Sequence, residues 1–263
     1  MTTVSDVYAF LDRLAPYALA ESWDRSGFNV GRGDHPVHKI LVALDPTETV
    51  CREAADRGAD LLVTHHTLLW HPDFVNDRSQ RGKCALFLIE HGIAHINAHT
   101  NLDLAPEGVN QVLARRLGLT NVRLLNPCGT LEDGRLWGLV RVGEVPRQPL
   151  GAFLRRVKTA LGCPALRYAD GGRDIGLAAV GGGCCTDEIR AVAAAGCDAF
   201  VTADAKYNDF WDARDLGLTL IDAGHFYTEN PVCALLAEKI AAAFPEVSVE
   251  ISQKHADCMK FFE

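Results

Sequence analysis

Hydrophobic and polar positions follow two different rhythms along the chain. Short apolar runs of strand length, such as 39–44 and the segment DLLVTHH at 60–66, alternate with longer stretches such as 4–14, where apolar residues recur every three or four positions. The short runs are typical of buried strands and the longer stretches of amphipathic helices. Their alternation predicts βα units, a largely parallel sheet and a fold of the α/β class.

Residues that start and end helices define several of these elements. Thr47 can cap a helix that closes at Gly58, and a helix over 79–91 ends before Gly92. The pattern further predicts helices over 106–117, 150–161, 186–195, 208–216 and 230–244, and strands over 93–98, 135–142, 175–180, 199–202, 218–225 and 247–252.

A change in composition suggests two lobes. Between Asn126 and Gly134 the chain is rich in Asn, Pro, Gly, Thr and Asp, which is typical of a connection between domains. We therefore expect residues 1–126 together with 223–263 to form a first α/β lobe, and residues 127–222 to form a second.

Charge and hydropathy exclude some classes of protein. The 263 residues carry 26 Lys and Arg against 34 Asp and Glu, a net charge of -8, and no basic patch of the kind that grips nucleic-acid phosphates. No apolar run approaches the roughly 20 residues that a membrane-spanning helix needs. The start, MTTVSDVYAFLDRLAP, does not resemble a signal peptide, so we expect a cytoplasmic protein that binds neither nucleic acid nor membrane.

The cysteines give no sign of a disulfide framework. There are nine, an odd number, and none form a CxxC pair, which also argues against a cysteine zinc site. Cys184 and Cys185 belong to the run GGGCC at 181–185. Its backbone amides could face an anion. The run lacks the spacing of a phosphate-binding loop, however, so a tight turn between strand and helix is the favoured interpretation.

Three polar segments follow predicted strands and carry the candidate chemistry. His65 and His66 end one strand, Asp103 lies beyond the next, and His225 and Glu229 occupy a later transition from strand to helix. Ligands of open α/β sheets bind beyond the carboxyl ends of the strands, so these segments can converge. Imidazole and carboxylate donors suit divalent Zn, Mn, Fe, Co or Ni.

The spacing of His225 and Glu229 suggests a site with two ions. Four positions apart, they share a face if both lie in one helical turn, and a carboxylate there can bridge two cations. Ions roughly 3.5 to 4 Å apart can activate a shared water for hydrolysis. A single histidine near a strand end is more often structural, so the prediction depends on the shared position of all three segments.

Five blocks of sequence resemble one known family. They are SWDRSGFNVG (22–31), LDPT (44–47), GADLLVTHHTLLW (58–70), NAHTNLDLAPEGVN (97–110) and IDAGHFYTE (221–229). In this order, spanning nearly the whole chain, they resemble the NIF-three-like family of dinuclear metal proteins, also called GTP cyclohydrolase I type 2 homologs.

The resemblance implies a ligand set for two divalent ions. His65 and His66 would go to different ions, with Asp103 joining the ion of His66, His225 joining that of His65, and Glu229 bridging. It also implies two intertwined α/β lobes with the metals in the cleft between them, and a ring-shaped homohexamer. The chain departs from many relatives at 208, where it has Asn instead of His.

Other residues near these blocks carry open alternatives. His99 resembles a position close to the metals, where it would hydrogen-bond a ligand or serve as an alternate one. Lys206 could meet an anionic substrate or be an ordinary surface lysine. Trp23 and Trp70 could line the crevice or pack in the core. His255 shows no partner pattern.

Two functions from different classes are consistent with this site. The first is a metal-dependent hydrolase of a small phosphorylated or heterocyclic molecule such as a nucleotide. GTP cyclohydrolase activity is implied by the family name alone, because the sequence has no signature for guanine or triphosphate. The second is a non-catalytic protein that delivers or buffers metal ions or regulates a partner. An open coordination position beside a substrate-sized pocket would favour the hydrolase.

Overall fold

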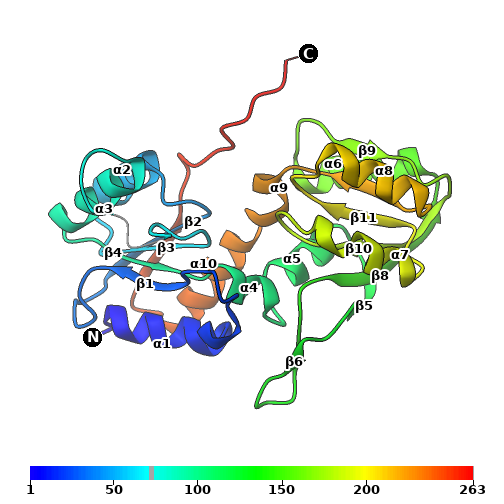
Figure 1. The fold of residues 1–263 in the computed structure, drawn as a ribbon. Helices are drawn as coiled ribbons and strands as arrows, with labels where there is room; N and C mark the ends of the chain where they lie inside the picture. The colour runs from blue at the N-terminus through cyan, green and yellow to red at the C-terminus, as the bar shows by residue number, and fades with distance from the viewer. Residues whose placement is uncertain (71–73, 263) are drawn as a thin grey trace. The chain divides into compact units, whose positions relative to one another are not determined.

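The computed structural model describes residues 1–70 and 74–262, and the chain divides into two compact units (Figure 1). Unit 1 comprises Met1–Ala105 and Val232–Asp257, and unit 2 comprises Pro106–Pro231 and Cys258–Glu263. Unit 1 is therefore assembled from two stretches, because the chain leaves it after Ala105 and returns at Val232.

Unit 1 contains a five-stranded sheet with the order β1-β4-β3-β2-β13. All neighbouring strands are parallel except β1, which runs antiparallel to β4. The strands are β1 (Gly27–Val30), β2 (Lys39–Ala43), β3 (Leu61–Thr64), β4 (Ala94–Asn97) and β13 (Ser248–Ile251). The helices are α1 (Val4–Leu14), the 3-10 turn η1 (Tyr17–Leu19), α2 (Glu48–Asp56), α3 (Gln80–Glu90), α4 (Thr100–Leu104) and α10 (Val232–Ala243).

Side-chain alternation on these strands buries both faces of the sheet. Leu41 of β2 and Leu62 of β3 pack with residues of α2 and α3, including Val50 and Leu88. On β2, Ile40 and Val42 are also fully buried, and α10 contacts this strand. Thr47 accepts a hydrogen bond from the amide of Val50 at 3.3 Å and so caps α2, as predicted.

Unit 2 contains a six-stranded sheet with the order β5-β8-β10-β11-β12-β9 and a separate hairpin of β6 and β7. Only β10, β11 and β12 are mutually parallel. The strands are β5 (Thr120–Leu124), β6 (Gly129–Thr130), β7 (Leu136–Trp137), β8 (Arg141–Gln148), β9 (Arg167–Ala169), β10 (Ile175–Val180), β11 (Ala199–Thr202) and β12 (Thr219–Asp222). The helices are α5 (Val109–Arg116), α6 (Leu150–Leu161), the 3-10 turn η2 (Thr186–Glu188), α7 (Ile189–Ala194), α8 (Tyr207–Asp215) and α9 (His225–Glu229).

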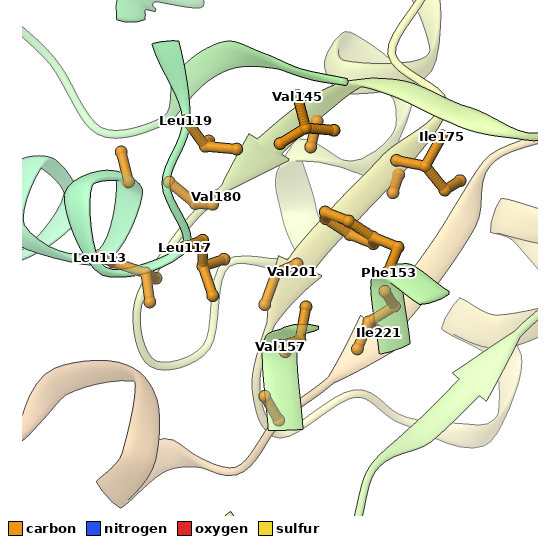
Figure 2. Close-up of a cluster of buried hydrophobic side chains, with 14 residues drawn as sticks. Leu113, Leu117, Leu119, Val145, Phe153, Val157, Ile175, Val180, Val201 and Ile221 are labelled. Atoms are coloured by element: carbon orange, nitrogen blue, oxygen red, sulfur yellow. The ribbon is translucent and has the colours of Figure 1, made fainter. Parts of the chain in front are cut away.

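The core of unit 2 has two layers, one on each face of the sheet. On one face, Phe153 and Val157 of α6 pack against Val180, Val201 and neighbouring strand residues (Figure 2). On the other face, a second cluster joins Phe200 and Leu220 to Val192 of α7 and Ala213 of α8. The α/β class predicted from the sequence is confirmed in both units.

The predicted boundary between the lobes differs from the observed one. Leu113 and Leu117 pack in the core that contains Phe153, so the segment after Ala105 belongs to unit 2. At the other boundary, α9 stays in unit 2, where the hydroxyl of Thr228 accepts a hydrogen bond from the amide of Gly183 at 3.1 Å. His225 and Glu229 therefore lie in unit 2, whereas the sequence placed them in the first lobe.

Some elements were wrongly placed or missed. The strand expected over 135–142 is two strands, β7 and β8, and unit 2 is less parallel than predicted because β5, β8 and β9 pair antiparallel. The edge strands β1, β5 and β9 and the short helix α4 were not predicted. In the described part of the chain, no helix is long and apolar enough to cross a bilayer.

Candidate metal centre

The candidate ligands of unit 1 follow two adjacent parallel strands. β3 pairs with β4 so that Thr64 lies beside Asn97, and His65 and His99 follow shortly after these two residues. The carboxyl ends of the two strands therefore deliver their histidines to the same edge of the sheet, as the sequence predicted.

A ring nitrogen of each histidine at this edge bonds to an oxygen atom. Nδ1 of His65 lies 2.8 Å from the carbonyl oxygen of Ala98. Nδ1 of His66 lies 2.6 Å from the carboxylate of Asp45, and Nδ1 of His99 lies 2.7 Å from that of Asp24. A carbonyl or carboxylate only accepts hydrogen bonds, so each Nδ1 must donate. In the neutral ring, Nε2 then carries the lone pair, which is the form that binds metal ions.

These histidines form a compact group of donors together with Asp103. One ring nitrogen each of His65, His66 and His99 lies within 4.8 Å of the others. The Oδ1 atom of Asp103, in α4, is 3.5 Å from Nε2 of His65, and both residues are buried. Burying a carboxylate is costly unless a cation or hydrogen bonds compensate its charge. This mixture of imidazole and carboxylate donors therefore fits a divalent transition-metal ion.

Asp24 accepts the hydrogen bond from Nδ1 of His99 and so fixes the orientation of this ring. It is buried and also accepts hydrogen bonds from the hydroxyl of Ser26 at 2.6 Å and from that of Thr100 at 2.7 Å. Burial alone would raise the pKa of Asp24, but the hydrogen bonds from His99 and Ser26 lower it well below its usual range. Asp24 therefore stays ionised and keeps the proton of His99 on Nδ1.

Asp45 has the same relation to His66 and a second histidine partner. Its Oδ2 atom lies 2.8 Å from Nε2 of His255, near the carboxyl end of unit 1. Burial alone would raise the pKa of Asp45, but the bonds to His255 and His66 lower it well below its usual range. The sequence singled out neither residue for the site. The one available signal was the block LDPT, which directly follows β2 and contains Asp45.

The candidate ligands of unit 2 form a pair on α9. The Nε2 atom of His225 lies 2.9 Å from Oε2 of Glu229, so the two residues do share one face of a helical turn. The Nδ1 atom of His225 lies 2.6 Å from Oδ2 of Asp204, which anchors this ring in the same way as His66 and His99. Glu229 is buried.

The GGGCC run packs closely against the side chain of Glu229. The amide of Gly182 donates to Asn110 at 2.7 Å, and Gly183 adopts a positive φ of 62°. A Cβ atom at Gly183 would lie 2.1 Å from Oε1 of Glu229, so only glycine fits this close approach. Cys184 is exposed, Cys185 is buried, and neither is in a disulfide. The run is thus a turn, as interpreted, with a role that the sequence did not suggest.

The remaining candidates have ordinary surroundings. Lys206 and Asn208 are exposed around the start of α8. His95 is fully buried in β4, and its Nε2 atom lies 2.8 Å from the hydroxyl of Thr64. Since that hydroxyl donates to the carbonyl of His66, it must accept from Nε2 of His95. His95 therefore has the opposite tautomer to the candidate ligands and is structural.

The fold and these donors define a class of α/β protein with histidine and carboxylate groups that could hold a metal. The chain belongs to the Duf34/NIF3 (NGG1p interacting factor 3) family, whose model matches residues 2–257. The family assignment made from the five sequence blocks is confirmed.

Individual relatives agree with this assignment. The chain is similar to a "GTP cyclohydrolase 1 type 2 homolog" of Streptomyces coelicolor, with 39% identity over 262 residues, covering 97% of this chain and 88% of the relative. It is also similar to the "GTP cyclohydrolase 1 type 2" of Helicobacter pylori, with 32% identity over 239 residues, covering 90% and 91%. A Bacillus cereus protein related to NIF3 shares the fold, with a TM-score of 0.93 at 23% identity over 100% of this chain and 99% of that one.

Proposed function

We propose that the chain binds two divalent metal ions and uses them to hydrolyse a small, nucleotide-like or phosphorylated substrate. The proposed ligands are His65, His66, Asp103, His225 and Glu229. The observation that carries this proposal is the anchoring of each candidate imidazole through Nδ1, because it leaves the lone pair of each ring on Nε2, the form that binds metal ions.

The division of ligands follows the family resemblance. His65 and His225 serve one ion, His66 and Asp103 serve the other, and Glu229 bridges the two. That the donors of both units serve one dinuclear centre is part of the proposal. His99 bonds to a ligand or replaces one. The donor types fit Zn, Mn, Fe, Co or Ni.

The chemistry of such a centre is hydrolytic. When bound, two dications would supply an activated water and stabilise the charge that develops in a hydrolytic step. The protein residues hold the centre in shape, since Asp24, Asp45 and Asp204 fix the orientation of three imidazoles. The names of the relatives, which refer to GTP, favour a nucleotide as the substrate.

The metal content tests the first half of the proposal. Protein prepared without chelator and loaded with Mn or Zn should contain up to two ions per chain by elemental analysis. Glu229→Gln keeps the size of the side chain but removes the charge that offsets two dications, so the affinity for both ions should fall. His225→Ala should mainly remove one of the two ions. A stoichiometry near zero in the loaded wild-type protein, or a folded Glu229→Gln that keeps two ions with unchanged affinity, would contradict the ligand set.

Turnover tests the second half. The metal-loaded protein should hydrolyse at least one member of a panel of nucleotides and phosphoesters, and metal removal should abolish the activity. A protein that holds two ions but turns over no member of the panel would instead support metal delivery, buffering or regulation.

A further inference from the structure

An aromatic platform lies beside the histidine cluster of unit 1. The rings of Trp23 and Trp70 are stacked, with their centroids 5.9 Å apart and an angle of 15° between their planes. Both meet His99 edge-on, with centroid distances of 6.1 Å for Trp23 and 5.4 Å for Trp70. Since His99 groups with His65 and His66, only the ring of His99 separates the two tryptophans from these candidate ligands.

Trp23 is not a core residue. It is 56% exposed, while the next residue, Asp24, is buried and bonded to His99. The backbone at Trp23 is therefore anchored while much of its indole ring faces solvent. One face of that ring is stacked on Trp70, which leaves the ring able to receive a second planar group by stacking. Of the two roles open from the sequence, the structure favours lining a binding surface.

Two arginines converge on the same platform. The guanidinium carbon of Arg81 lies 5.9 Å from the ring centroid of Trp70, and Nε of Arg25 donates to the carbonyl of Trp70 at 3.2 Å. Both side chains are exposed, in a chain whose net charge is -8. Guanidinium groups recognise phosphate well, because their planar set of donors matches two phosphate oxygens.

We propose that this platform binds the substrate as a nucleotide, with the base stacked on Trp23 and the phosphate held by Arg25 and Arg81. An uncharged ring would use only the tryptophans and a free phosphate only the arginines, so their combination favours a ligand that carries both groups. This inference rests on the proposed function, because it places the nucleotide beside the histidine cluster. Base stacking on an aromatic side chain tolerates different bases, so the platform selects nucleotides as a class rather than guanine.

Calorimetric titration of the metal-loaded protein tests the platform without requiring turnover. We expect guanosine 5′-monophosphate to bind more tightly than guanosine, which lacks the phosphate, and than ribose 5-phosphate, which lacks the base. Trp23→Ala should raise the dissociation constant of the nucleotide about ten-fold or more, which is typical for loss of one base stack. Trp23→Phe should restore part of the affinity.

Matched variants separate the two parts of the platform. Arg25→Gln and Arg81→Gln should weaken binding of the nucleotide and of ribose 5-phosphate but not of guanosine. Trp211→Ala removes a tryptophan of unit 2 that is 47% exposed, and it should change nothing. Metal content and circular dichroism should match wild type in every variant.

The outcomes distinguish this inference from the proposed function. Nucleotide binding that depends on Trp23 in a protein without turnover would support the platform and overturn the hydrolase. Turnover of a nucleotide with the same KM in wild type and a folded Trp23→Ala would overturn the platform and leave the hydrolase standing. Equal affinities for the nucleotide and ribose 5-phosphate in the wild-type protein would also overturn it.

Discussion

At the scale of single residues, the groups that accept the Nδ1 hydrogen bonds of the candidate histidine ligands differ in charge. His65 is anchored by a neutral carbonyl, whereas His66 and His225 are anchored by the carboxylates of Asp45 and Asp204. A carboxylate behind an imidazole makes the ring a stronger metal donor and fixes its orientation. The anchoring carboxylates should therefore contribute to metal affinity although they are not among the proposed ligands.

The first prediction concerns Asp45. Asp45→Asn removes the charge behind His66 while keeping the shape, so metal affinity should fall about 10- to 100-fold. His255→Gln should have a smaller effect, since the carboxylate remains. Competition with a chelator of known affinity measures both. Asp56→Asn is the control, because that carboxylate pairs with Lys254 at the exposed surface. Unchanged affinity in Asp45→Asn would show that the contact does not matter for binding.

The second prediction concerns Gly183. Gly183→Ala should displace the Glu229 carboxylate, because the added Cβ would lie 2.1 Å from its Oε1 atom, and metal affinity should fall about ten-fold or more. Gly196→Ala is a matched control in the same unit, since Gly196 has a φ of 77° and no atom within 4 Å of an added Cβ. Both variants carry the backbone cost of alanine at positive φ, about 1 kcal/mol.

Only Gly183→Ala should lose metal by elemental analysis, whereas both should unfold at slightly lower temperature. Equal metal content in the two variants would show that the turn does not position Glu229.

At the scale of elements, prediction from sequence succeeded where burial and chain signals agree. The strands β2, β3, β11 and β12 are apolar runs buried on both faces, and Thr47 caps α2 as its position indicated. It failed at edge strands such as β5, which is mostly exposed and owes its conformation to pairing with β8. Propensity carries little information about such strands, because the partner decides their structure.

The candidate site could also be predicted only in part. The strand ends that carry His65, His66 and His99 could be found from the pattern of apolar runs. Their anchoring partners could not, because Asp24 and Asp45 are distant in sequence and reach the histidines only through tertiary packing. The same holds for His255, which bonds to Asp45.

The third prediction is a pH dependence that originates in β4. Burial lowers the pKa of His95 to about 3, from about 6.5 in an unfolded chain. Above pH 6.5 both states hold a neutral ring, and this residue adds no pH dependence. Below pH 6.5 the unfolded chain binds a proton that the folded one does not. The free energy of unfolding should therefore fall by about 1.4 kcal/mol per pH unit from this residue alone as the pH approaches 3.

Denaturant unfolding between pH 7 and pH 4, in the presence of chelator, measures this effect. His95→Gln keeps a donor for Thr64 and cannot titrate. The slope of its free energy of unfolding against pH should therefore be smaller, by the amount that corresponds to about one proton taken up on unfolding. Identical slopes in the variant and the wild-type protein would show that His95 is accessible to protons in the folded state.

At the scale of the whole molecule, the fourth prediction is a homo-oligomer larger than a dimer, with a hexamer expected. It rests on the family resemblance. Light scattering at micromolar concentration should give a mass well above the 28.6 kDa of one chain. A stable monomer or dimer would show that this member does not form the ring.

The discontinuity of unit 1 affects the order in which the chain can assemble during translation. The sheet and helices of unit 2 come from one stretch, so that unit can fold soon after it leaves the ribosome. Unit 1 must wait, because β13 pairs with β2 only after all the strands and helices of unit 2 have been made. Throughout that interval His66 lacks the brace that His255 provides through Asp45. A metal ion captured before β13 and His255 have been made would therefore meet an unfinished site.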